Sequence, residues 1–546
     1  MSIIKSLVNY YVKGLKPKEK SFIELNTSFW KKQYKSTQAV GNKYVLVFKE
    51  AYPLILVGNA HISSMIAVER GLKLLFVIPT FLNKSMIKVL ESYPNANFVF
   101  EDNIHLLMSR LHSYFEALRT IINFKTPEEV LAYQIDGLEV GDLIYDSYLS
   151  CGYATMKKVH TFDLFKTLQR FFYSKRMIYY IINHYNIEIC LMSHTCGVAG
   201  GTVARYLIKN NAEVWERWVT LKKHTNINTL YDSGARPEMK YVRYMKSRKS
   251  HFIPLAEKHL NDRLENRNTD YGAYLPYQKE KRVFNNKDEF SKFFNLDNNK
   301  KNIFVMMHAF NDYPNSFGFS IYRDYYQWFE TVLNIAQKID TVNWIFKEHP
   351  GAEYYPTKDL DLKTVFSGIN ASNIRFIDGN SNFNTSSLKY IADVICTCIG
   401  TAGLEYAAFG IPCILGGKSW YAGFGFTIEP RNDDEFKTVL KNIDKIPRLN
   451  DEQIDMAKII ALLTFNIFDV TNLPDPFGTS VTFDADAQRK LSSEQIFDII
   501  VAHRTKSSWE EKVQYINSIK KFIHDKNSTQ FVDLDKNSFF RNMSEE

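Results

Sequence analysis

One segment, residues 394–412, constrains the fold more than any other part of the chain, because it encodes a strand, a turn and a helix in immediate succession. Residues 394–399 form an apolar run of strand length, and two glycines enclose the small-residue turn at 400–403. Residues 404–409 are good helix formers that a glycine and a proline close. Such a turn lets an anion approach the backbone N–H groups at the helix start. The segment therefore predicts an anion-binding unit of a parallel α/β sheet.

The same alternation of short apolar runs and helix-like segments extends over most of the chain. Apolar runs of strand length alternating with helices imply a parallel sheet. A further run at 187–193 leads into a glycine-rich turn and a helix-like segment at 202–209. In the N-terminal part, the apolar runs expected as strands are 44–48, 54–57, 74–78 and 98–100.

A chain of 546 residues is too long for one hydrophobic core. We predict two Rossmann-like α/β domains that face each other across a cleft, with appended helices. The predicted division is a basic amphipathic region at 1–35, an α/β domain at 36–265, a polar connection at 266–300, a second α/β domain at 301–483, and C-terminal helices with a polar tail at 484–546. We expect a C-terminal helix to cross back to the first domain.

The first twenty residues carry apolar side chains at three-and-four spacing together with five lysines, which predicts a basic amphipathic helix. Two interpretations are open for this helix. It docks on the protein's own N-terminal domain, or it lies at a membrane surface.

Composition excludes several functional classes. The net charge of +8 is spread along the chain without a nucleic-acid-binding motif, so nucleic acid is not an expected partner. The six cysteines include no Cys-x-x-Cys pair, and they indicate buried thiols rather than a metal or redox site. With no signal peptide and no apolar run of bilayer length, the expected compartment is the cytoplasm, peripheral on the inner membrane face if residues 1–20 bind lipid.

Polar side chains follow several of the predicted strands. Ser193 and His194 close one strand of the N-terminal half, His308 and Asp312 follow the strand at 304–307, and His349 follows the one at 342–346. Because ligands of doubly wound sheets bind at the carboxyl ends of the strands, we expect these histidines to converge on one cleft.

The second half contains a Lys-Glu-His-Pro motif at 347–350, about fifty residues before the strand–turn–helix unit. Together with 304–312 and 421–430, these segments resemble the C-terminal domain of GT-B glycosyltransferases, especially bacterial capsule and surface-polysaccharide transferases that carry a His-Pro motif. Residues 141–149 and 193–205 look similar, more weakly, to segments of surface-carbohydrate biosynthesis proteins.

The resemblance implies a nucleotide-sugar donor as substrate, no cofactor and no metal. Growing negative charge on a departing nucleotide must be stabilised, and without a metal this falls to helix starts and basic side chains. In the resembling enzymes the His-Pro histidine contacts the donor phosphate, which assigns that role to His349; Thr401 would offer a hydroxyl or cap the helix, and Glu405 would bind the ribose. The predicted donor-binding set is His308, Asp312, Lys347, His349, Gly400, Thr401, Ala402, Gly403 and Glu405.

An inverting transferase also needs a base that removes the proton of the acceptor hydroxyl. The candidates in the predicted acceptor-side domain are His194, Asp146 and Asp142, and His194 is the best placed of the three. Asp142 has the competing interpretation of a helix N-cap. A retaining enzyme would need a different assignment, and the sequence does not reveal the stereochemistry.

Several functional alternatives stay open. The donor we favour is a CMP-activated acidic sugar such as Kdo or sialic acid, with UDP- and GDP-sugars as alternatives, and the expected acceptor is a glycan or a lipid-linked glycan. Other classes are a glycerol- or ribitol-phosphate transferase for teichoic-acid-like polymers, a sugar-nucleotide epimerase, and a non-catalytic glycan-binding partner in a polysaccharide assembly complex.

Overall fold

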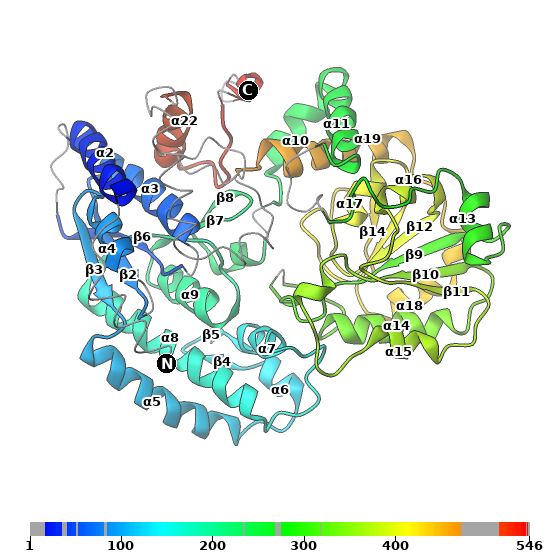
Figure 1. Ribbon diagram of the computed structural model, residues 1–546, viewed down its shortest axis with the longest axis horizontal. Helices are drawn as coiled ribbons and strands as arrows, with labels where there is room; N and C mark the ends of the chain where they lie inside the picture. Colours follow the sequence, from blue (N-terminus) through cyan, green and yellow to red (C-terminus); the bar gives the residue numbers. More distant parts are fainter. Residues whose placement is uncertain are drawn as a thin grey trace.

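The computed structural model describes residues 17–34, 41–50, 53–80, 84–232, 235–267, 275–316, 318–470, 513–534, 536–541 and 543. The chain forms two α/β halves that lie side by side, each built on a six-stranded sheet (Figure 1). The two predicted Rossmann-like domains are thereby confirmed. Residues 1–16, the greater part of the predicted amphipathic helix, lie outside the described residues, and helix α2 (Pro17–Tyr34) follows them.

The first sheet has the strand order β3-β2-β1-β6-β7-β8. All neighbouring strands run parallel except β7 and β8. A small antiparallel hairpin, β4 (Gln134–Ile135) and β5 (Leu138–Glu139), stands apart from this sheet. The strands are β1 (Lys43–Val47), β2 (Lys73–Ile78), β3 (Ala96–Phe100), β6 (Asn186–Met192), β7 (Glu213–Arg217) and β8 (Leu221–His224).

Helices connect and cover these strands. They are α3 (Pro53–Arg70), α4 (Lys84–Glu91), α5 (Ile104–Ile121), α6 (Pro127–Leu131), α7 (Gly141–Leu149), α8 (Phe162–His184) and α9 (Thr202–Lys209), which a π-helical turn at Gly197–Gly201 precedes. The strand expected at 54–57 is wrong, because these residues belong to α3. Pro53 suits the first position of a helix, and a short apolar run cannot be distinguished from a buried helix by periodicity alone.

The second sheet is parallel throughout, with the order β11-β10-β9-β12-β13-β14. Its strands are β9 (Asn302–Met306), β10 (Asn343–Lys347), β11 (Ile374–Ile377), β12 (Val394–Thr397), β13 (Cys413–Leu415) and β14 (Thr427–Ile428). Its helices are α13 (Lys287–Phe294), α14 (Tyr325–Ala336), α15 (Leu362–Ser367), α16 (Leu388–Ile391), α17 (Ala402–Ala407), α18 (Asp433–Lys441) and α19 (Asp451–Leu462).

Both sheets change winding direction at their centre, between β1 and β6 in the first and between β9 and β12 in the second. Residues that follow these four strands lie beside the crevice where doubly wound folds bind ligands. The topology therefore predicts that ligand-binding residues lie in the segments that begin at Phe48, Ser193, Met307 and Cys398.

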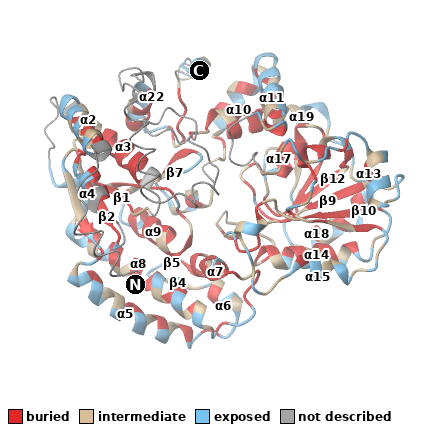
Figure 2. Ribbon diagram, viewed as in Figure 1, coloured by how far each residue is buried: buried red, intermediate tan, exposed pale blue. Residues whose placement is uncertain are grey.

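Apolar side chains fill the two faces of each sheet, and the interior of both halves is buried (Figure 2). Along β1, Val45 and Val47 contribute to one cluster and Leu46 to the other, as the alternation of a strand requires. No helix in the described part of the chain has the length and apolar character needed to cross a bilayer.

Two segments extend beyond the sheets. Helices α10 (Met239–Lys246) and α11 (Lys249–Leu264) pack with α19 in the core of the second half. Helix α22 (Val513–His524) returns to the first half and packs on α3, as expected for a C-terminal helix (Figure 1).

Candidate active site

His308 lies at the central crevice of the second half, just beyond the end of β9. Its ring stacks on Tyr325 with 4.1 Å between the centroids. The N–H of Ile399 donates to His308 Nε2 at 3.2 Å. Burial, and then the charge of His349, lower the pKa of His308 to about 3. The imidazole is therefore neutral at pH 7, with its proton on Nδ1.

His349 follows β10 and has a defined tautomer as well. The N–H of Gly351 donates to His349 Nδ1 at 3.1 Å. Burial, and then the charge of Lys347, lower the pKa of His349 to about 4. In a neutral ring that accepts at Nδ1, Nε2 carries the proton. His349 consequently presents a fixed N–H donor rather than a positive charge.

Lys347 is the last residue of β10 and is only 2% exposed. Its Nζ lies 3.3 Å from the carbonyl oxygen of Glu348, and among the described residues no carboxylate is within salt-bridge distance of it. Burial lowers the pKa of Lys347 to about 7, and the nearby positive charge of Lys281 adds to this effect. A buried ammonium group without a counter-ion is costly, so this position favours an anion.

The start of α17 reaches the same crevice. The N–H of Gly400 donates to Thr397 Oγ1 at 3.2 Å, and a Cβ at Gly400 would lie 2.8 Å from that oxygen, which excludes a larger residue. Thr401 occupies the N-cap position of α17, but its exposed side chain makes no capping bond. Thr401 thus stands at the N-cap position, as one of the two interpretations required, but does not cap the helix through its side chain; its hydroxyl and the backbone of Ala402 lie at the helix start.

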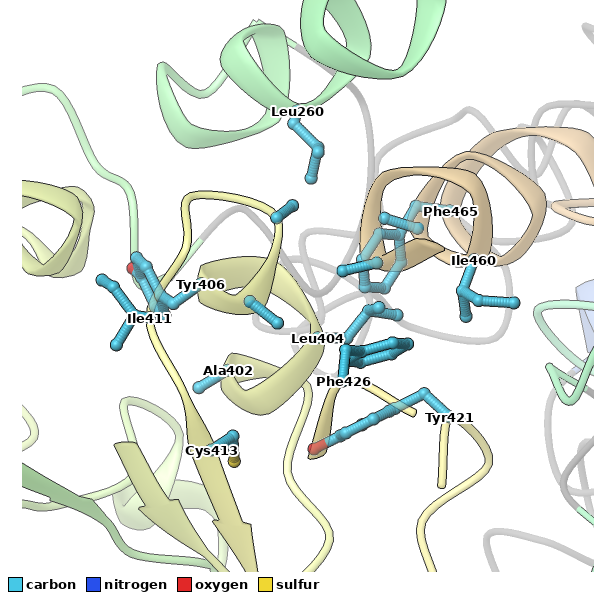
Figure 3. Close-up of a cluster of buried hydrophobic side chains, with 14 of the residues drawn as sticks. Leu260, Ala402, Leu404, Tyr406, Ile411, Cys413, Tyr421, Phe426, Ile460 and Phe465 are labelled. Atoms are coloured by element: carbon cyan, nitrogen blue, oxygen red, sulfur yellow. The ribbon is translucent and has the colours of Figure 1, made fainter. Parts of the chain in front are cut away.

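Gly403 faces the interior rather than the crevice. A Cβ at Gly403 would lie 2.3 Å from the hydroxyl of Tyr421 and 2.7 Å from Cys413 Sγ. Figure 3 shows Tyr421 and Cys413 in the apolar cluster beneath α17. The glycine lets this helix pack closely on the sheet, so the expected approach of a phosphate at Gly403 has no support in the geometry.

Glu405 has partners within the protein. Arg263 Nε donates to Glu405 Oε1 at 2.8 Å, and the hydroxyl of Tyr277 donates to Oε2 at 2.8 Å. All three side chains are buried. Through these two bonds Glu405 fixes α17 to α11 and to the segment that contains Tyr277. Both carboxylate oxygens are therefore occupied within the protein, and neither is free for the expected contact with a ribose.

In the first half, three side chains form a connected chain at the crevice between β1 and β6. The N–H of Ser193 donates to Glu50 Oε1 at 3.0 Å, and the Ser193 hydroxyl donates to the same oxygen. Ser193 Oγ also lies 2.8 Å from His194 Nδ1. Since the hydroxyl proton goes to Glu50, Oγ accepts the Nδ1 proton of His194, and Nε2 is left as a free base.

The surroundings of His194 maintain this neutral form. Its side chain is exposed at the crevice, and its ring lies 4.6 Å from the ring of Trp218. Desolvation by the crevice walls lowers the pKa of His194, against the opposing charge of Glu216. Glu50 itself is half-buried, and burial raises its pKa. Glu50 was missed from the sequence, although it lies only two residues beyond the apolar run at 44–48.

The two aspartates proposed as alternative bases are engaged elsewhere. Asp142 forms a two-oxygen ion pair with buried Arg205 and accepts a bond from Tyr231 at 3.2 Å. It is not the N-cap of α7, because Val140 occupies that position. Asp146 is 2% exposed and accepts from the backbone and side-chain nitrogens of Asn315 at 2.9 and 2.8 Å. Neither carboxylate is free to act as a base.

Asp312 lies in the loop after β9 and is exposed. Desolvation nevertheless raises the pKa of Asp312 to about 6. In the other half, the pKa of Cys196 is raised mainly by burial, and the charge of Asp312 adds to this together with those of Glu216 and Asp146. Asp312 is therefore placed close to both crevices, and it does not join the Lys347 and His349 pair.

Two cavities adjoin these residues. One, of about 400 Å³, opens at the ends of β9, β10 and β11, and its polar lining includes His308, Glu348, Glu353, Asp361, Lys363, Asp378 and Asn380. This acidic lining suits hydroxyl groups better than a phosphate. The second, of about 600 Å³, lies between the halves, with Asp142 and Tyr231 on one side and Asn315 and Lys418 on the other.

The structure thus brings the predicted donor residues His308, Lys347, His349, Gly400, Thr401 and Ala402 to one crevice, and His194 to the other. Within the described ranges there is no cluster of three or more histidine, cysteine or acidic side chains able to hold a metal ion. Lys281, whose charge acts on Lys347, was not anticipated because it lies in the polar connection between the halves.

Comparison with known proteins gives distant structural likenesses. No family model matches the chain, and no curated protein matches it in sequence. The β-Kdo 2,7 transferase KpsC of Thermosulfurimonas dismutans is 13% identical over 58% of this chain and 92% of its own, with a TM-score of 0.31. The wall teichoic acid polymerase TagF is 12% identical over 92% of this chain and 97% of its own, with a TM-score of 0.22.

A third likeness is to an enzyme of a different class. The UDP-GlcNAc 2-epimerase of Neisseria meningitidis is 10% identical over 85% of this chain and 100% of its own, with a TM-score of 0.24. Likenesses of this distance to transferases and to an epimerase do not distinguish between the two activities.

Proposed function

We propose that this protein is a glycosyltransferase that moves a sugar from a nucleotide-activated donor to a glycan or lipid-linked glycan acceptor. The observation that carries the proposal is Lys347, a buried basic group at the end of a central strand that forms no salt bridge with a carboxylate of the described residues, although Glu348 and Asp378 act on it from a distance. A nucleotide phosphate would supply the missing negative charge.

The leaving group is stabilised on the second half. As the bond between the anomeric carbon and the phosphate oxygen breaks, negative charge grows on the departing phosphate. Lys347 in its protonated form and the Nε2–H of His349 act on that charge, and both groups are held by the backbone before the substrate arrives. Hydroxyl groups of the donor would occupy the neighbouring acidic cavity, where Glu348 lies.

The acceptor is activated from the first half. Nε2 of His194 takes the proton of the acceptor hydroxyl while the oxygen forms its bond to the anomeric carbon, which inverts that centre. The imidazolium that results is stabilised by its Nδ1–H bond to Ser193, which Glu50 polarises. Asp142 and Asp146 have no part in this mechanism, since internal partners occupy them.

The favoured donor remains a CMP-activated acidic sugar, the reaction is proposed to need no metal, and the cytoplasmic face of the membrane is the proposed site of action. The resemblance of the Lys-Glu-His-Pro segment supports these finer assignments. A thermal-shift screen of CMP, UMP, UDP, GDP and CDP would identify the nucleotide, because a ligand that binds the folded state raises the melting temperature.

The decisive experiment measures transfer with a panel of sugar nucleotides by wild type and by His349→Ala. We expect transfer with one nucleotide class and a loss of about a hundredfold or more in kcat for the variant, since a preorganised donor to the leaving group is removed. His184→Ala is the matched control, because His184 lies at the far end of α8. Wild-type turnover by a folded His349→Ala protein would reject the proposed site, and 2-epimerisation without transfer would reject the proposed activity.

A further inference from the structure

Helix α5 exposes an apolar stripe along its entire outer side. Seven large side chains recur at three-and-four spacing and are between 43% and 72% exposed. The α5 stripe consists of Ile104, Leu107, Met108, Leu111, Phe115, Leu118 and Ile122. Residues three and four apart share one face of a helix, so the stripe is continuous over nearly five turns.

This exposure is not needed to attach the helix to the protein. The opposite side of α5 already buries Leu106, Ala117 and Ile121 against α8 and the neighbouring core. An ordinary surface helix would place charged side chains on the outer face. Eight of the twenty exposed large hydrophobic side chains in the described part of the chain belong to α5 and its C-cap, the stripe together with Tyr114.

The α5 stripe continues onto the start of α8. The Phe162 side chain is 64% exposed, and Nζ of Lys166 lies over its ring, 4.3 Å from the ring centroid. An apolar depression lies between the two helices, where Leu118, Ile122 and Phe165 line it. In Figures 1 and 2 the helix runs along the lower edge of the molecule with its outer residues exposed.

Basic side chains lie beside the C-terminal part of the stripe. Arg119 is exposed on one flank of α5, Lys158 is exposed just before α8, and Lys166 is exposed in the first turns of α8. The acidic residue within the helix, Glu116, is neutralised by Arg176 at 2.8 Å. An apolar stripe flanked by basic side chains is complementary to the surface of an anionic bilayer.

The shape of the surface favours a bilayer over a second protein. A helix of 18 residues is roughly 27 Å long, and the seven side chains lie on its convex outer face rather than in a groove. One straight, convex helix at the molecular edge instead allows all seven side chains to enter a planar lipid surface together.

We propose that the α5 stripe is a membrane-docking surface that inserts its apolar side chains between the headgroups of an anionic bilayer. The docking surface is formed by a different segment of the sequence from residues 1–20 and does not depend on the proposed enzymatic activity. The Leu111 and Phe115 side chains, 60% and 72% exposed, would enter the lipid near the middle of the helix.

Flotation of the full-length protein with phosphatidylcholine vesicles, with and without phosphatidylglycerol, tests this surface. We expect the wild type to float with the vesicles, and more strongly when phosphatidylglycerol is present. A Leu111→Glu, Phe115→Glu double variant should lose roughly tenfold or more in binding, because it removes two buried apolar side chains and adds charge. The matched control is Met239→Glu with Leu255→Glu, which changes two exposed apolar residues on α10 and α11 and should float like the wild type.

Further experiments distinguish binding of lipid to the α5 stripe from binding of another protein molecule. A protein that lacks residues 1–16 should still float, because the docking surface is retained. Flotation of the α5 double variant at the wild-type level, or loss of flotation through the deletion alone, would overturn the proposal. Sedimentation that shows a wild-type dimer, a monomeric α5 variant and no vesicle binding would assign the stripe to a second copy of the chain. Leu111→Trp should be quenched by brominated lipid, and absence of quenching would also contradict insertion.

Discussion

A buried lysine without a carboxylate partner couples anion binding to proton uptake. Burial lowers the pKa of Lys347 to about 7, whereas the pKa of His349 is lowered to about 4, so His349 stays neutral near physiological pH. A bound phosphate stabilises the charged lysine and raises its pKa. Nucleotide binding above about pH 7 must therefore take up a proton, and affinity should fall as pH rises, by up to about tenfold per pH unit.

Calorimetric titration of the nucleotide between about pH 6 and pH 9 measures this dependence. Lys347→Met keeps the length of the side chain, removes its charge and should flatten the curve while it weakens binding. Lys249→Met is the control, because Lys249 pairs with Asp455 at the surface of α11 and its pKa is raised, not lowered. A Lys347→Met protein with the wild-type pH slope would show that another group takes up the proton.

The hydroxyl of Ser193 determines which nitrogen of His194 is free. Ser193→Ala removes the acceptor for the Nδ1 proton, so the ring is no longer fixed with Nε2 as the base. We expect kcat to fall by about tenfold or more while the Michaelis constant for the nucleotide stays within a few fold. Ser193→Thr keeps the hydroxyl and should retain most of the rate. Equal rates for the alanine and threonine variants would contradict the assigned tautomer.

At the scale of the secondary-structure elements, Gly403 determines how closely α17 approaches the sheet. In Gly403→Ala the new methyl group would meet Tyr421 and Cys413, and the bond from the Tyr421 hydroxyl to the Gly400 carbonyl would have to break. We expect a loss of about 1–3 kcal/mol in the free energy of unfolding, measured by denaturant titration. Gly368→Ala, where a Cβ would lie 3.6 Å from the carbonyl oxygen of Val365, should change stability much less.

The elements were more predictable from sequence than the roles of individual side chains. The strand expected at 187–193 and the helix at 202–209 match β6 and α9, because their lengths and flanking glycines agree with one assignment. The partners of Glu405 and Asp146 could not be foreseen, since Arg263 and Asn315 lie more than a hundred residues away. The order of the strands in the sheet could not be predicted from the sequence either. Only the pairing of β1 with β6 brings Glu50, which follows β1, beside Ser193, which follows β6.

Across the whole molecule, Asp146 joins the two halves. It lies on α7 and accepts three hydrogen bonds from Asn315 and Ser316 in the loop after β9. A double-mutant cycle of Asp146→Ala and Asn315→Ala should give a coupling energy of about 0.5–3 kcal/mol in unfolding free energy. The surface pair Lys258 and Asp262, one turn apart on α11, is the control, and its coupling should be much smaller.

The same link should affect catalysis through the relative position of the halves. We expect Asp146→Ala to lower the transfer rate while nucleotide affinity stays within a few fold, because the nucleotide contacts belong to the second half. A lower transfer rate with unchanged nucleotide affinity would show that Asp146 positions the two halves and does not itself contact the nucleotide. Loss of nucleotide binding equal to that of His349→Ala would show that the nucleotide spans both halves.

The return of the chain to its first half has a consequence for synthesis on the ribosome. Ile519, Phe522, Ile523 and Phe531 complete the apolar core beside α3, and the N–H of Phe531 donates to the carbonyl of Leu221 at 2.9 Å. The first half to leave the ribosome therefore waits for nearly the entire chain before its core can close. The second half has its whole sheet once β14 has emerged, but Val532 and Phe540 belong to its core too, so both halves close on the same C-terminal segment.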